Sequence, residues 1–73
     1  MNKKYANATG ETAFRLWMFS LGLEELKKNF NADKRAALLE KASAYERSRY
    51  VENNATAEEK HDLKQIVEDL KAL

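Results

Sequence analysis

Few side chains in this chain have the types and spacing that catalysis or metal binding requires. The 73 residues include one histidine, His61, and no cysteine, so thiolate ligands and a cysteine nucleophile are excluded. A metal site or a catalytic pair needs several suitable groups, and His61 has no second ligand of the usual kind near it. We interpret His61 as a solvent-exposed residue on a C-terminal helix.

Carboxylates are adjacent at Glu24 and Glu25 and again at Glu58 and Glu59. They are typical of solvated helix charges, because no apolar pocket is indicated that would raise the pKa of one partner. The sequence has no glycine-rich phosphate loop, nucleophile elbow or metal-ligand spacing. We therefore expect a non-enzymatic protein with no metal, no cofactor and no small-molecule substrate.

Four cations bracket a predicted turn between two helices, and a helix-turn-helix could present them to DNA. They are Lys27, Lys28, Lys34 and Arg35. Acidic residues lie among them, and the formal net charge of the chain is only +1. Solvated helix ends explain the same residues. Binding to DNA through these cations is therefore the alternative to the main interpretation.

The stretch "AFRLWMFSLGL", residues 13–23, is the most apolar part of the chain. It is too short to cross a bilayer, which takes about 20 apolar residues, and it includes Arg15 and Ser20. It also does not fit a signal peptide, because Arg15 interrupts it and "EELKK" follows where small residues should stand. We expect a cytoplasmic protein with no membrane partner.

Helices must position these residues, because proline is absent and only two glycines occur. We predict an all-α fold, a small bundle of about four helices forming a single domain over residues 1–73. Residues 1–8 are expected to be a loose lead-in. The predicted helices are 9–21, capped by Thr9 and ended or kinked at Gly22, then 23–30, then 32–53, capped by Asn31, and 57–72, opened by a Thr56–Glu59 capping box.

Two of these helices are apolar on more than one side. In the first, one stripe comprises Phe14, Trp17, Met18 and Leu21, while Leu16, Phe19 and Leu23 point elsewhere. Such a helix is either enclosed by neighbours or exposes one side to a partner. Helix 32–53 carries Leu38, Leu39, Ala42 and Tyr45 on one face and Ala37, Ala44 and Val51 on another, so it is expected between two neighbours.

The main interpretation is a protein-binding module: an adaptor, inhibitor or regulator that binds a partner protein or a second copy of itself. Exposed aromatic and methionine side chains are typical of such contacts. The residues predicted to make the contact are Phe14, Trp17, Met18, Leu21, Tyr45, Arg49 and Tyr50.

One resemblance bears on this interpretation. The order of "FRL", "LEELKKNF" and "ADKRAALLEKASAYERSRYVEN" within residues 13–53 resembles the Hha-type small nucleoid-associated proteins. The chain departs from that family in spacing and in its last helix. The resemblance implies a small helical protein that acts by binding a DNA-binding partner.

Overall fold

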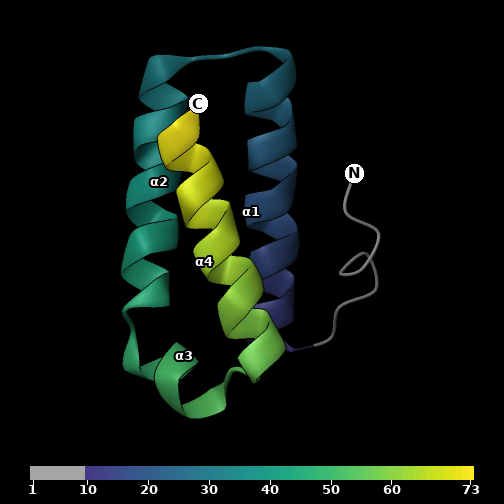
Figure 1. Ribbon diagram of the computed structural model, residues 1–73, viewed down its shortest axis with the longest axis vertical. Coiled ribbons are helices and arrows are strands. Elements are labelled where there is room, and N and C mark those ends of the chain that lie inside the picture. Colours follow the sequence, from purple (N-terminus) through teal and green to yellow (C-terminus); the bar gives the residue numbers. More distant parts are fainter. Residues whose placement is uncertain (1–9) are drawn as a thin grey trace.

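The computed structural model describes residues 10–73, which form four α-helices. They are α1 (Glu11–Lys28), α2 (Ala32–Glu46), α3 (Arg49–Asn54) and α4 (Ala57–Ala72). Helices α1 and α4 run in the same direction, α2 runs opposite to both, and the short α3 closes one end of the bundle (Figure 1). Because α4 packs against both α1 and α2, the three long helices share one core. The prediction of a small all-α bundle is confirmed.

All four helices contribute to this core. Its buried apolar residues are Leu16, Phe19, Leu23, Leu26, Ala42, Val51, Leu63, Ile66, Val67 and Leu70. In α1 the spacing from Leu16 to Leu26 alternates between three and four residues, which keeps these side chains on one face. The amphipathic stripe predicted for the last helix is buried as far as Leu70, whereas Leu73 lies beyond the helix and is 38% exposed.

Gly22 does not end the first helix, so the predicted division into helices 9–21 and 23–30 is wrong. Residues Glu11–Lys28 form one continuous helix, and Gly22 has no positive φ. A Cβ atom built on Gly22 would lie 2.6 Å from Cδ2 of Leu38 in α2. The glycine is therefore a point of close approach between helices. Burial of Leu23 and Leu26 stabilises the helix beyond it.

The predicted helix 32–53 is also wrong in extent, because the chain breaks between Glu46 and Arg49. Ser48 makes the break without glycine or proline: its hydroxyl donates to the Tyr45 carbonyl at 2.6 Å and accepts from the Val51 amide at 3.3 Å. These bonds satisfy backbone groups at the end of α2 and the start of α3. The turn directs Val51 into the core.

Two predicted helix starts are confirmed. The Asn31 side chain accepts from the Lys34 amide at 3.0 Å. The capping box of α4 is complete, with Thr56 Oγ1 accepting from the Glu59 amide at 3.0 Å and Glu59 Oε1 accepting from the Thr56 amide at 2.8 Å. Thr9 and the predicted lead-in 1–8 lie outside the described residues. Gly10 occupies the N-cap of α1 without a side-chain hydrogen bond.

Candidate protein-binding surface

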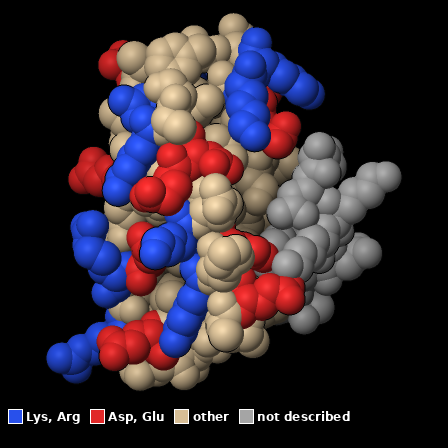
Figure 2. Space-filling view, in the orientation of Figure 1, with Lys and Arg blue, Asp and Glu red and all other residues tan. Residues whose placement is uncertain are grey.

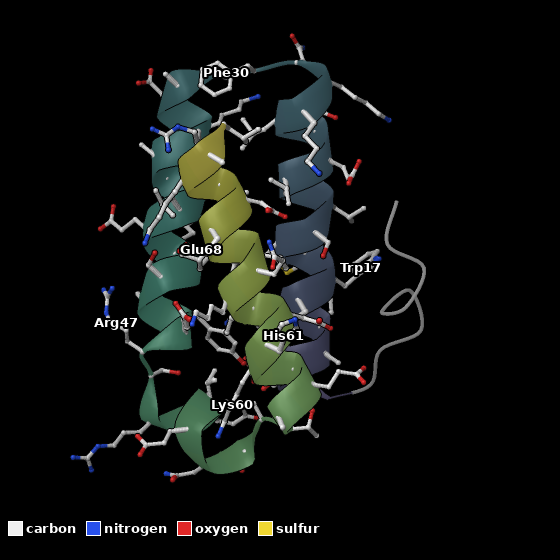
Figure 3. All side chains as sticks on the ribbon, viewed as in Figure 1. Trp17, Phe30, Arg47, Lys60, His61 and Glu68 are labelled. Atoms are coloured by element: carbon white, nitrogen blue, oxygen red, sulfur yellow. The ribbon has the colours of Figure 1, made fainter. Side chains whose placement is uncertain are left out.

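The side of α1 that points away from the core is apolar, and we call it the outer face of α1: Phe14, Trp17, Met18 and Leu21. At ~100° per residue these positions lie on the opposite side of the helix from Leu16 and Phe19. Phe14 is 48% exposed and Met18 is 44% exposed, while Trp17 and Leu21 are half-buried. The Phe14 and Trp17 rings are in contact, with centroids 6.0 Å apart. Figure 3 shows Trp17 on the side of α1 away from α2, and its half-buried side chain also packs against the core.

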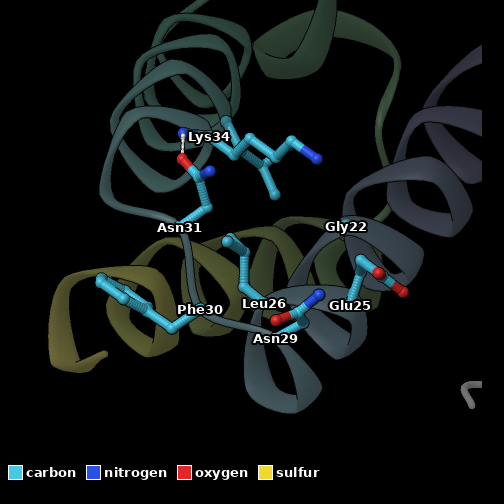
Figure 4. Close-up of a pocket in the computed structure, with 8 residues that line it drawn as sticks. Gly22, Glu25, Leu26, Asn29, Phe30, Asn31 and Lys34 are labelled. Carbon is cyan, nitrogen blue, oxygen red and sulfur yellow. Dashed lines mark hydrogen bonds between the residues drawn. The ribbon is translucent and has the colours of Figure 1, made fainter.

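A groove runs beside this face, between α1 and α2, and we call it the α1–α2 groove. Two hollows of about 280 and 610 Å³ form it, and Leu38 lines both. On the α1 side the lining includes Arg15, Met18, Gly22, Glu25 and Asn29, and on the α2 side Lys34, Leu38, Lys41, Tyr45 and Ser48. No described residue of α4 lines either hollow. Figure 4 shows residues of both helices around the smaller hollow.

The predicted second stripe of helix 32–53 is corrected by this arrangement. Helix α2 does have two neighbours, α1 and α4, but it packs on both through the stripe of Leu38, Leu39, Ala42 and Tyr45. Ala37 and Ala44 are exposed instead. Ala44 lines the larger hollow, where its small side chain leaves room for another chain to approach.

Tyr45 connects the groove to the core. Its ring lies 6.0 Å from that of Phe19 and 6.4 Å from that of Tyr50, and the Arg15 guanidinium lies 5.6 Å from its centroid. The Tyr45 hydroxyl donates to Thr12 Oγ1 at 3.3 Å. Burial raises the pKa of Tyr45 above its usual range, although the Thr12 hydrogen bond opposes the shift. The aromatic ring is thus held in place while one edge remains open to the groove.

The other two predicted contact residues lie at the first turn of α3. Tyr50 is 43% exposed and Arg49 is exposed. Tyr50 joins the surface around Tyr45 through its ring contact, whereas Arg49 has no described contact with the outer face of α1. Sequence reasoning missed Phe30, which is 56% exposed and lines the smaller hollow. The predicted helix 23–30 ends at this residue, and its place before a turn was a signal of exposure.

The four cations of the DNA alternative lie at one end of the bundle, at the close of α1 and the start of α2. Two of their side chains have contacts within the described part of the protein. Arg35 Nη1 donates to the Leu70 carbonyl at 3.1 Å, which satisfies an acceptor at the C-terminal end of α4. Lys27 Nζ lies 3.8 Å from Glu24 Oε1. Lys28 and Lys34 are exposed. One guanidinium N–H of Arg35 is thus used within the protein, and the Glu24 carboxylate offsets the charge of Lys27.

The face covered by α4 differs from the groove. Figure 2 shows lysine, arginine and acidic side chains intermixed across it, and His61 is exposed on the same helix (Figure 3). Among residues 10–73, no group of three or more histidine, aspartate or glutamate residues is arranged to hold a metal ion. None of the described helices has the length and apolar character needed to cross a bilayer.

Comparisons with known proteins give no indication of function. No family model, no curated protein and no solved structure matches the chain. The resemblance of residues 13–53 to Hha-type proteins therefore receives no support from these comparisons.

Proposed function

We propose that this protein is a non-enzymatic module that binds another protein chain through the side of the α1–α2 pair that α4 does not cover. The contact would be centred on the outer face of α1, with Tyr45 and Tyr50 beside it and Arg49 at its edge. An adaptor, inhibitor or regulator could act in this way, and a cytoplasmic location remains part of the proposal.

One observation carries the proposal: Phe14 and Met18, two large apolar side chains on the outer face of α1, are exposed and stand outside the core cluster, against which their neighbour Trp17 packs. Leu16 is fully buried, whereas Phe14 and Met18, each two residues away on the opposite side of the helix, are both more than two-fifths exposed. Contiguous apolar patches on a small protein mark interaction sites, and aromatic and methionine side chains are enriched there. A domain of this size also gains stability from a partner, since it buries only about 60% of its unfolded surface.

The test measures the affinity of variants for the purified partner. The partner is first captured from the source cells with the full chain and identified by mass spectrometry. We expect Phe14→Ala or Met18→Ala to weaken its affinity by about 2 kcal/mol, roughly thirtyfold, as for an anchor residue. Leu73→Ala is the matched control, because Leu73 is an exposed apolar residue just beyond the end of α4. If Leu73→Ala weakens binding as much as Phe14→Ala does, the assigned contact surface is wrong.

DNA binding is the alternative function, and no contact within residues 10–73 favours it. The cations involved lie on helix ends, and one of them, Arg35, is bound to the Leu70 carbonyl. A mobility-shift assay on the same preparation tests this alternative directly.

A further inference from the structure

The α1–α2 groove has the shape that would receive a third helix. Its α1 wall follows the positions 15, 18, 22, 25 and 29, and its α2 wall follows 34, 38, 41, 45 and 48. Both series alternate between steps of three and four residues. This spacing places side chains along one seam, as in helices that pack with knobs in holes. Helix α4 packs against the other side of the α1–α2 pair. A further helix in the groove would therefore give a bundle of four long helices.

The floor of the groove is apolar and shallow at its centre. Leu38 lies there, shared by both hollows, and Gly22 faces it without a side chain. Met18, at 44% exposure, and Ala44 flank the larger hollow. A helix carrying apolar side chains at intervals of three and four residues could therefore insert them between Met18 and Ala44.

The charged residues that line the groove indicate which charge a bound helix should carry. The larger hollow contains Arg15 and Lys41 and no acidic residue, and the smaller contains Lys34 and Glu25. Arg15 is paired with Glu11 at 3.3 Å. Within residues 10–73, neither Lys34 nor Lys41 takes part in an ion pair. These two lysines are seven positions apart, so they stand on one rim about two turns apart.

We propose that the α1–α2 groove binds an amphipathic helix of a partner protein whose apolar stripe is flanked by carboxylates that face Lys34 and Lys41. This deepens the proposed function and rests on it, because it names the structural class of the partner. A second copy of the chain is a poorer occupant: two grooves placed face to face would bring lysines of like charge together.

The probe is a fluorescein-labelled helical peptide about as long as the 18-residue α1, with leucines at steps of three and four residues and a flanking row of glutamates. A second peptide carries lysine in place of each glutamate. Fluorescence anisotropy with the full chain should show the glutamate peptide binding at least about tenfold more tightly than the lysine peptide. Equal affinity of the two peptides, or no binding of either, would overturn the proposal.

Variants of the full chain locate the site. Lys41→Glu should weaken binding of the glutamate peptide most and Lys34→Glu less, because Glu25 already lies in the hollow beside Lys34. Lys64→Glu is the matched control, since Lys64 is an exposed lysine of α4 outside the groove. Ala44→Glu should also weaken binding, whereas Ala36→Glu, on an exposed part of α2 that lines neither hollow, should not.

Three further outcomes would overturn the inference. One is an equal effect of the groove and control variants. Another is dimerisation of the parent, seen by sedimentation, that Ala44→Glu abolishes. A third is binding to phosphatidylserine vesicles, in place of the peptide, that depends on Lys41. If Phe14→Ala weakens binding of the captured partner but Lys41→Glu and Ala44→Glu do not, the proposed function stands and only the assignment of the groove fails.

Discussion

The close approach of α1 and α2 at Gly22 predicts a coupling between two residues that can be measured. In an exposed helix interior, replacement of glycine by alanine stabilises by about 1 kcal/mol. Here the new Cβ would lie 2.6 Å from Leu38 Cδ2, about 1 Å inside ordinary carbon–carbon contact. Leu38 or the backbone would have to shift, and overpacking of this kind costs about 1 to 3 kcal/mol. Gly22→Ala should thus be neutral or destabilising in the parent chain.

The same change should have the opposite sign once Leu38 is shortened. In a Leu38→Ala background the contact is absent, so Gly22→Ala should stabilise by about 1 kcal/mol. The difference between the two backgrounds is a coupling energy of at least about 1 kcal/mol. Urea unfolding of the four proteins, followed by circular dichroism, measures it. Equal stabilisation in both backgrounds would show that Leu38 does not restrict the side chain at position 22 and that Gly22 serves no packing role.

Three other predictions concern the α4 cap, Tyr45 and the cations of the DNA alternative. Thr56→Ala should lower the free energy of unfolding by about 1 kcal/mol through loss of the α4 cap, and coincident urea midpoints for parent and variant would contradict the cap. Because burial raises the pKa of Tyr45, the folded state favours the neutral phenol. The contribution of this group to the free energy of unfolding should be fully present below the unfolded pKa of about 10, and it should be lost as the pH rises through the folded pKa. The Tyr45→Phe variant should lack this loss of stability at alkaline pH. At neutral pH it should be less stable than the parent by about 1 kcal/mol, because the hydrogen bond from the Tyr45 hydroxyl to Thr12 is removed. Unfolding curves of parent and variant at pH 7 and above pH 10 measure both effects. If DNA binding occurs, the double change Lys34→Ala, Arg35→Ala should reduce both the affinity and its salt dependence in a shift assay, and unchanged values would remove the DNA alternative.

Helix starts were predictable from sequence because they depend on neighbouring residues. Asn31 and Thr56 each accept a bond from an amide three positions later, so the signal is contained in four residues. Ser48 makes the same kind of bond to Val51 but was missed, since the apolar periodicity of the flanking residues continues across it. Gly22 was misread for the opposite reason: its role is a tertiary contact with Leu38, which local pattern does not reveal.

The candidate site was predictable only in part. Periodicity separated Phe14 and Met18 from Leu16, but it did not decide which stripe faces the core. The decision comes from α2 and α4, which bury the side containing Leu16 and leave Phe14 and Met18 exposed. The α1–α2 groove could not be derived from either helix separately, because its walls meet only when Gly22 lies against Leu38.

The proposed contact surface is tested most directly by cross-linking in the source cells. A photoreactive benzoylphenylalanine in place of Phe14, itself an exposed aromatic residue, changes the outer face of α1 little. The same group in place of Lys64 on α4 serves as the comparison. We predict a discrete adduct with one protein, identified by mass spectrometry, from position 14 and none from position 64. No adduct at position 14, or the same adduct from both positions, would contradict the proposal that this protein acts by binding through α1.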